Sequence, residues 1–271
     1  MTDHYAVVGN PVAHSRSPQI HAEFARQTGQ DLDYIRLPAP PDGFAAAVEA
    51  FRASGGLGVN VTLPFKLDAF RYATRHSGRA QHAHAVNTLK FEGRQALGDN
   101  TDGAGLVRDI EINLGCQLAG KNVLLMGAGG AARGVLLPLL ERQPRKLVIA
   151  NRTPAKAAAL ARHAQSENCA GAGYPDLAGA QFDIVINATS ASVGGEVPPL
   201  PADIFAAGAF AYDMMYGKEP TSFMRFARAH GAARITDGIG MLVEQAAESF
   251  FVWRGVRPVT ASVIEKLRIE D

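Results

Sequence analysis

Residues 121–132 read KNVLLMGAGGAA, a short apolar run that leads directly into a glycine-rich turn. The apolar run predicts a strand buried on both faces, and residues 131–140 after the turn predict a helix. Gly127, Gly129 and Ala132 take the three fixed positions of a G-x-G-x-x-A dinucleotide fingerprint. The first permits a tight turn, the second admits a pyrophosphate, and the third lets helix and strand pack closely. The sequence therefore predicts a pyrophosphate site at a helix N-terminus, formed by Gly127, Ala128, Gly129, Gly130 and Ala131.

The alternative is a turn that only packs a helix on a sheet. The strand before the glycines and the helix after them supply the context that a nucleotide site requires, so we favour the nucleotide.

The end of the next predicted strand, residues 146–150, indicates which dinucleotide binds. An NAD site usually has an Asp or Glu there, whereas this chain continues with Asn151, Arg152 and Thr153. The planar guanidinium of Arg152 can hold a 2′-phosphate, and Thr153 can donate its hydroxyl to the same group. The alternatives are a solvated surface arginine and a threonine that only caps the following helix. We predict NADP, held in part by these three residues.

Apolar runs and alanine-rich helical stretches alternate along the whole chain, which predicts an α/β fold with mostly parallel sheets. The predicted strands cover residues 6–8, 33–37, 58–61, 87–91, 121–126, 146–150, 182–186 and 210–212. The predicted helices cover residues 17–27, 43–52, 65–72, 104–113, 131–140, 153–164 and 240–254, the last of them long enough to return to the first domain. The pattern restarts after residues 98–103, so we place domain boundaries that give segments 1–101, 102–238 and 239–271.

Three segments of the first domain carry polar residues that packing does not need. They read GNPVAHSRSP (9–18), NVTLPFK (60–66) and AVNTL (85–89). In open α/β sheets, ligands bind beyond the carboxyl ends of the strands, where all three segments can meet. The hydroxyls of Ser15 and Ser17 could bind a carboxylate there, although Ser17 before Pro18 also fits a helix N-cap.

On these stretches the chain resembles the shikimate dehydrogenase family. Further matching stretches are GDNTDG (98–103), GAGGAA (127–132), NRT (151–153), NATS (187–190), YDMMY (212–216) and DGIGMLVEQAAESF (237–250), all in order along nearly the whole chain. The resemblance implies a substrate-binding and catalytic first domain, a Rossmann-type NADP-binding domain, and an active site between them. It also implies the reversible NADPH-dependent reduction of 3-dehydroshikimate to shikimate, a step in the synthesis of aromatic amino-acid precursors.

The resemblance also implies roles for single residues. Ser15 and Ser17 would bind the substrate carboxylate with Tyr216 nearby, and Thr62, Asn87 and Gln245 would bind substrate hydroxyls. Lys66 and Asp102 would form the catalytic pair, and Met214 and Gly238 would contact the nicotinamide end of the cofactor. The family often has glycine where this chain has His84, so we expect a local change of helix end or turn at that position.

Hydride transfer to a ketone leaves an oxygen that needs a proton, and Lys66 is a suitable donor. Spacing alone fits a structural Lys–Asp ion pair equally well, and the family motifs favour the catalytic one. The sequence leaves open whether Lys66 is neutral or charged during the cycle, because its neighbour Asp102 and burial have opposite effects on its charge.

Composition excludes several other classes of protein. The 27 basic and 26 acidic residues give a net charge of +1, which argues against binding nucleic acid through phosphate neutralisation. Two cysteines form neither a disulfide framework nor a metal motif, and we expect no metal. No apolar run is long enough for a membrane span, and no signal-peptide core is visible. We expect a cytoplasmic monomer or homodimer that binds a small-molecule substrate.

Three rival functions remain open at this point. They are an NAD-dependent quinate/shikimate dehydrogenase, a methylenetetrahydrofolate dehydrogenase, and a regulatory nucleotide-binding protein that has lost catalysis. The tetrahydrofolate reading lacks a reason for the two serines, and the presence of both Lys66 and Asp102 argues against the regulatory one.

Overall fold

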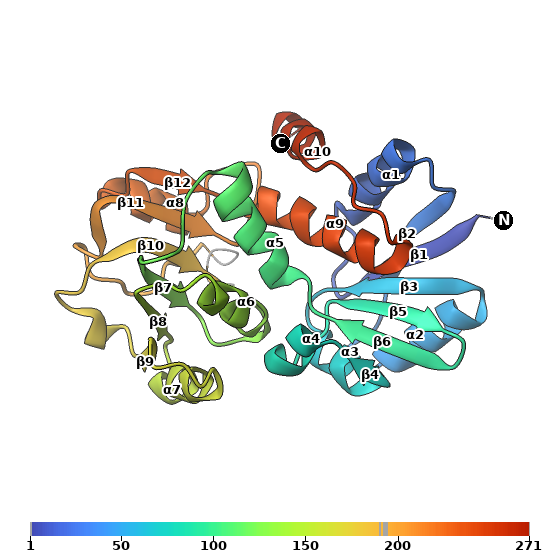
Figure 1. Ribbon diagram of the computed structural model, residues 1–271, viewed down its shortest axis with the longest axis horizontal. Coiled ribbons are helices and arrows are strands. Elements are labelled where there is room, and N and C mark those ends of the chain that lie inside the picture. The colour runs from blue at the N-terminus through green and yellow to red at the C-terminus, as the bar shows by residue number, and fades with distance from the viewer. Residues whose placement is uncertain (1, 190, 192–194, 271) are drawn as a thin grey trace. The chain divides into compact units, whose positions relative to one another are not determined.

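The computed structural model describes residues 2–189, 191 and 195–270, and the chain divides into two compact units (Figure 1). Unit 1 comprises Met1–Gly105 and Leu242–Lys266, and unit 2 comprises Leu106–Met241 and Leu267–Asp271. Both main transitions fall inside helices, α5 (Asp102–Arg108) and α9 (Ile239–Arg254). Turn residues therefore cannot mark these transitions, which lie a few residues beyond the sequence boundaries at 101 and 238.

Unit 1 is built on a six-stranded sheet in the order β2-β1-β3-β5-β6-β4. Its strands are β1 (Asp3–Gly9), β2 (Leu32–Pro38), β3 (Gly56–Val61), β4 (Arg75–His76), β5 (Thr88–Glu92) and β6 (Gln95–Asp99). β1 pairs in parallel with β2 and β3, whereas β5 is antiparallel to both β3 and β6. β4 also pairs in parallel with β6, so three of the five pairings are parallel and the sheet is mostly parallel, as predicted. The antiparallel part is β5, which pairs with β3 and forms a tight hairpin with β6 whose turn includes Gly93 at φ +58.

Helices cover both faces of this sheet. They are α1 (Ser17–Thr28), α2 (Phe44–Ala53), α3 (Lys66–Tyr72), α4 (Gly78–Ala83) and most of α9 and α10 (Ala261–Glu270). Phe44, Phe51 and Phe65 pack in the core on one face, and Trp253 of α9 packs with Tyr5 and Tyr34 on the other. The Trp253 indole also donates to the Leu89 carbonyl at 3.0 Å, which fixes α9 on the sheet.

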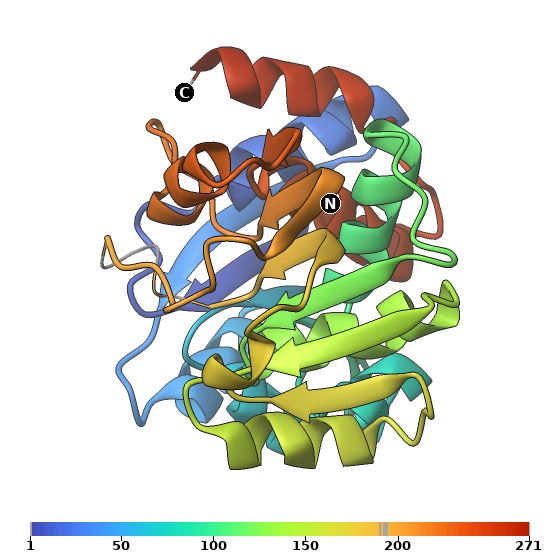
Figure 2. The ribbon, with the colours of Figure 1, turned by 90° about the vertical axis from the view of Figure 1, so that its left-hand side faces the viewer.

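Unit 2 is a wholly parallel sheet in the order β12-β11-β10-β7-β8-β9. Its strands are β7 (Asn122–Met126), β8 (Lys146–Ala150), β9 (Cys169–Ala172), β10 (Phe182–Asn187), β11 (Phe205–Asp213) and β12 (Arg234–Thr236). Its helices are α6 (Gly130–Glu141), α7 (Pro154–His163) and α8 (Ser222–Ala229), with α7 lying along the β9 edge (Figure 2). This is the Rossmann strand order, and it reverses between β7 and β10.

The central strand β7 is buried on both faces, as the sequence predicts. Val123 and Leu125 belong to one core cluster, while Leu124 and Met126 belong to the cluster on the other face. Alternate side chains of one apolar strand therefore hold helices on opposite sides of the sheet. The α/β fold class and the Rossmann-type unit are confirmed.

Several elements differ from the prediction. The predicted helix over 104–113 is α5 followed by a π-helical turn, Asp109–Asn113. Helix α9 is not the last, because α10 follows it. The elements that the sequence analysis did not predict are β4, α4, β6, the short strand β9, the 3-10 turn Pro175–Leu177, α8, β12 and α10. Within the described residues, no helix combines the length and apolar character that a membrane span requires.

Candidate active site

The three polar segments of unit 1 meet at one edge of its sheet. The first two follow the parallel strands β1 and β3, and the Asn10 N–H donates to the Leu63 carbonyl at 3.0 Å. The third precedes the antiparallel strand β5, so its amino end reaches the same edge, where Val61 N–H donates to the Asn87 carbonyl at 2.7 Å. Thr62 lies so close to Gly9 that a Cβ at Gly9 would overlap the threonine methyl group. The predicted convergence of these segments is present in the structure.

Four predicted site residues form one hydrogen-bonded chain at this edge. Lys66 Nζ lies 2.5 Å from Asp102 Oδ2. Asn87 Nδ2 donates to Asp102 Oδ1 at 2.8 Å and to Gln245 Oε1 at 3.3 Å. The side chains of Lys66 and Asp102 are 17% and 7% exposed, so the pair is shielded while Lys66 keeps access to a ligand. An amine, a carboxylate and two amides thus stand side by side.

The sequence analysis did not identify the residue that orients the Asn87 amide. Thr101 is fully buried, and its N–H donates to Asn87 Oδ1 at 2.8 Å while its hydroxyl accepts from Asn87 Nδ2 at 2.9 Å. The amide nitrogen therefore has to point toward Asp102. Thr101 stands in the matched stretch GDNTDG, where it directly precedes Asp102.

The two serines lie at the start of α1. Ser15 Oγ donates to Ser17 Oγ at 3.2 Å. The helix begins at Ser17 itself, with Arg16 as N-cap and no side-chain cap, so the alternative reading of Ser17 as N-cap is wrong. The Ser17 N–H in turn donates to Ser15 Oγ at 3.3 Å, so the two hydroxyls lie side by side. Arg36 holds the Ser15 carbonyl from β2 at 2.7 Å.

A buried layer under this edge supports it and was also not predicted. Tyr34 donates to Asn60 Oδ1 at 2.7 Å, and burial raises the pKa of Tyr34 well above its ordinary value. Asn60 Nδ2 donates to Ser249 Oγ of α9 at 2.9 Å. Because both groups are buried in chains of bonds, their orientations are fixed from within unit 1.

The glycine turn of unit 2 fits a dinucleotide. Gly127 has φ +108, which only glycine adopts easily. A Cβ at Gly129 or Gly130 would meet no atom within 4 Å, so the protein's own packing leaves open space above the turn. The N-cap residue of α6 is Gly129, which has no side chain to accept from the first amides of this 12-residue helix. These amides are therefore left for a phosphate.

Arg152 and Thr153 lie exposed at the end of β8. Thr153 is the N-cap residue of α7, yet its hydroxyl makes no capping bond, so the capping alternative does not account for it. Asn151 Nδ2 donates to the Thr153 carbonyl at 3.1 Å and holds the turn. The residues present therefore suit a 2′-phosphate, with one guanidinium and one hydroxyl facing outward.

Met214 and Gly238 are in direct contact within unit 2. A Cβ at Gly238 would overlap the Met214 carbonyl oxygen, and Gly238 N–H donates to the Met215 carbonyl at 3.0 Å. Tyr216 is half-buried in the same loop, residues 214–221. The structure thus brings the two predicted nicotinamide contacts together, and Tyr216 follows Met214 by two residues in the chain.

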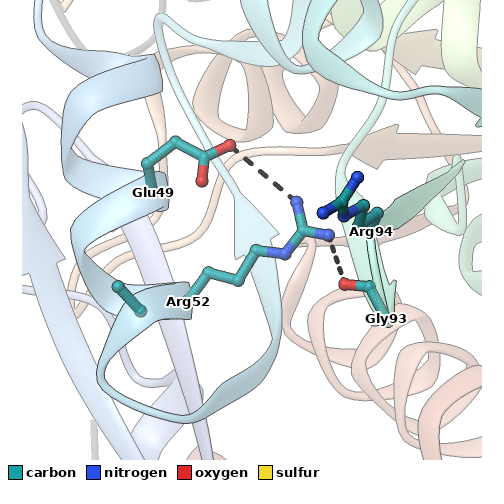
Figure 3. Close-up of a pocket in the computed structure, with 5 residues that line it drawn as sticks. Glu49, Arg52, Gly93 and Arg94 are labelled. Carbon is teal, nitrogen blue, oxygen red and sulfur yellow. Dashed lines mark hydrogen bonds and ion pairs between the residues drawn. The ribbon is translucent and has the colours of Figure 1, made fainter.

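A surface hollow of about 440 Å³ lies elsewhere on unit 1 and contains none of the predicted site residues. Glu49, Arg52, Ala53, Gly93 and Arg94 line it (Figure 3). Arg52 donates to the Gly93 carbonyl at 2.6 Å and lies 3.8 Å from Glu49, so its charge is already partnered. Within the described residues, no group of three or more His, Cys, Asp or Glu side chains could hold a metal ion.

Comparison with known proteins covers both units. Residues 7–89 match the shikimate dehydrogenase substrate binding domain, residues 110–193 match shikimate / quinate 5-dehydrogenase, and residues 238–268 match the shikimate 5′-dehydrogenase C-terminal domain. A shikimate dehydrogenase (NADP(+)) of Nitrosospira multiformis is 63% identical over 99% of this chain and 98% of its own.

Two solved structures show the same fold. One is an Ael1 enzyme from Pseudomonas putida, which is 52% identical with a TM-score of 0.93 and 98% coverage of both chains. The other is the shikimate 5-dehydrogenase of Thermus thermophilus in complex with NADP(H) and shikimate, which is 31% identical with a TM-score of 0.88 and 99% coverage of both chains. Since the three matched domains and the relatives extend over most or all of the chain, the protein belongs to the shikimate dehydrogenase family.

Proposed function

We propose that the protein catalyses the reversible NADPH-dependent reduction of 3-dehydroshikimate to shikimate in the synthesis of aromatic amino-acid precursors. The observation that carries the proposal is the chain Lys66–Asp102–Asn87–Gln245, a shielded proton donor among hydrogen-bonding groups suited to a polyhydroxylated ring. The full-length relative with this activity in its name supports it. We further propose a cytoplasmic monomer or homodimer.

The bound cofactor supplies or accepts the hydride, and the protein supplies position and proton transfer. We assign proton transfer at the reacting oxygen to Lys66 Nζ. Asp102 Oδ2, 2.5 Å from that nitrogen, holds the amine in place and balances its charge. Asn87 keeps the other carboxylate oxygen occupied, so the carboxylate cannot turn away from Lys66.

The other groups of unit 1 bind the substrate without reacting. We assign the carboxylate to Ser15 and Ser17, with Tyr216 of unit 2 nearby. Thr62, Asn87 and Gln245 bind substrate hydroxyls. Because the protein amides are already oriented, they lose little rotational freedom when they bind the substrate hydroxyls. This favours the hydroxylated ring over less hydroxylated ones.

Unit 2 holds the cofactor. The pyrophosphate is assigned to the turn from Gly127 to Ala131, and the 2′-phosphate to Arg152 and Thr153 with Asn151 shaping the turn. Met214 and Gly238 contact the nicotinamide end. The names of full-length relatives support NADP.

The role of Lys66 is tested by Lys66→Met, which keeps much of the side-chain volume and removes the amine. We expect turnover of shikimate to fall by about 10²–10⁴-fold, the usual contribution of a positioned acid or base. NADP⁺ binding, measured by calorimetric titration, should stay unchanged because Lys66 belongs to unit 1. Near-normal turnover in this variant would show that the Lys66–Asp102 pair is structural.

A further inference from the structure

A fully buried carboxylate lies at the carboxyl end of β11. Asp213 Oδ1 accepts hydrogen bonds from Asn187 Nδ2 and from the Met215 N–H, each at 3.0 Å. Its Oδ2 accepts from the Thr221 hydroxyl at 2.6 Å. Asp213 itself is 0% exposed, so these donors take the place of water around the carboxylate.

Two of the three donors are themselves fixed in orientation. Asn187, at the end of β10, accepts on Oδ1 from the Thr189 N–H and hydroxyl at 3.1 and 2.7 Å. Its amide nitrogen must therefore face Asp213. The Thr221 hydroxyl caps α8 by accepting from the Met224 N–H at 3.1 Å, which directs its own hydrogen toward Asp213.

These bonds join the ends of two strands to both ends of one loop. Met215 lies near the start of loop 214–221, and Thr221 is its last residue before α8. The Met214 N–H donates to the Asn187 carbonyl at 2.9 Å, and Gly238 presses on Met214 from the other side. The Asp213 carboxylate thus links the two ends of the loop, and the backbone bond of Met214 and its contact with Gly238 also hold the first residues in place.

An amide at position 213 cannot replace the carboxylate. Asparagine offers one acceptor oxygen and one NH₂ group, whereas both oxygens of Asp213 face donors. The fixed orientation of Asn187 prevents the network from adapting by a flip. Either the Thr221 hydroxyl or the pair of N–H donors would then face a nitrogen.

We propose that Asp213 is a positioning residue that sets loop 214–221 and, through it, the affinity for both cofactor and substrate. The proposal rests on the proposed function, in which Met214 contacts the nicotinamide end and Tyr216 lies close to the substrate carboxylate. Asp213 is buried under the loop, and its effect on both ligands passes through the backbone of Met214, Met215 and Tyr216.

The first test is Asp213→Asn, with KM for NADP⁺ and for shikimate measured separately. We expect each KM to rise at least about tenfold, the effect of losing a hydrogen bond to a charged group. Asp183→Asn is the matched control. Asp183 stands at the other end of unit 2's sheet on β10, where it accepts from the Asn122 N–H at 2.8 Å, and this variant should leave both KM values unchanged.

A second pair of variants keeps the proposal testable if Asp213→Asn does not fold. Thr221→Val removes the hydroxyl that donates to Asp213, and Thr221→Ser retains it. We expect the valine variant to raise both KM values and the serine variant to restore them. A merely structural role would lower the melting temperature of the valine variant and leave both KM values at the wild-type level, and that result overturns the proposal.

Calorimetric titration with NADP⁺ separates this inference from the proposed function. A wild-type protein that binds NADP⁺ but does not oxidise shikimate contradicts the proposed function, whereas weaker NADP⁺ binding in Asp213→Asn would still support the loop's role. An active wild-type protein with unchanged constants in Asp213→Asn and Thr221→Val contradicts only the inference.

Discussion

His21 of α1 is the buried polar residue of unit 1 that hydrogen bonding explains least. Its ring stacks on Tyr34 with centroids 4.2 Å apart and planes 6° from parallel. Neither ring nitrogen has a hydrogen-bond partner among the described residues, and the side chain is fully buried. Burial lowers the pKa of His21 to about 3, so the ring is neutral at neutral pH and serves as an aromatic wall beneath the serines.

This lowered pKa makes stability depend on pH. Below the ordinary pKa of 6.5, His21 is protonated in the unfolded chain, whereas in the folded protein it stays unprotonated down to about pH 3. The free energy of unfolding should therefore decrease with falling pH in this window, by up to about 1.4 kcal/mol per pH unit from this group. We would measure the free energy of unfolding of His21→Phe by urea titration at a series of pH values. Its decrease with falling pH should be less steep than in the wild type. An unchanged slope would mean that His21 is protonated in the folded protein.

A substitution of Arg152 tests which cofactor the protein prefers. Because it is exposed at the end of β8, its removal should not disturb folding. We expect Arg152→Ala to raise KM for NADP⁺ by about tenfold or more, since a charged hydrogen bond to the 2′-phosphate is lost. KM for NAD⁺, which lacks that phosphate, should hardly change. Arg162→Ala, at an exposed arginine of α7, is the control, and equal effects of the two variants would disprove the assignment.

The element that carries Asp102 is held by an ion-pair network. Arg79 of α4 binds Asp99 at the end of β6 through two nitrogens, at 2.6 and 2.7 Å, and reaches Glu248 of α9 at 2.9 Å. Asp99 also accepts from the Asn100 N–H at 2.7 Å. The loop from Asp99 to Asp102 is therefore tied to a helix on each side.

This network should fail in acid. Burial raises the pKa values of Asp99 and Glu248, but the arginines oppose it and the net shift of both is downward. The stability that they contribute is present above the unfolded-chain values of 3.8 and 4.5 and is lost as pH falls below them.

Arg79→Met should lower the free energy of unfolding by about 1–3 kcal/mol near neutral pH and flatten its acid dependence. Arg71→Met, which breaks an exposed pair with Asp68, should change it by less than about 1 kcal/mol in the same urea titration. Equal losses would contradict the network's role.

Sequence predicted the long buried strands of both units better than the short elements for a physical reason. Parallel strands buried on both faces are continuous apolar runs, as in β7, and these are visible without a structure. The hairpin β5–β6 and the two-residue strand β4 carry no such run. The sequence also predicted a change of helix end or turn at His84. It ends α4 in the left-handed conformation at φ +48, the conformation that a glycine takes without strain, so the backbone keeps the turn despite the side chain.

In the whole molecule, the proposed substrate-binding and proton-transfer residues lie mainly in unit 1, and the proposed cofactor-binding residues lie in unit 2. The hydrogen-bonded chain from Lys66 to Gln245 belongs to unit 1, and the glycine turn and Arg152 belong to unit 2. The sequence predicted site residues among the polar groups at strand ends, since these groups have no packing role. It did not indicate Thr101, Asn60 or Asp213, because their importance lies in buried partners that are distant in the chain. Under the proposed function, unit 1 selects the substrate and unit 2 selects the cofactor, so variants of one unit should change the constants of one ligand. The exception is loop 214–221, which serves both.

The most direct test of the account is oxidation of shikimate and of quinate, each with NADP⁺ and with NAD⁺, followed at the absorbance band of the reduced nicotinamide. The account predicts that shikimate with NADP⁺ has the highest kcat/KM, at least about tenfold above shikimate with NAD⁺, because only NADP⁺ offers a 2′-phosphate to Arg152. Equal or better activity with NAD⁺ or with quinate would contradict the assignments of Arg152 and of the substrate residues. No activity in any combination would contradict the proposed function itself.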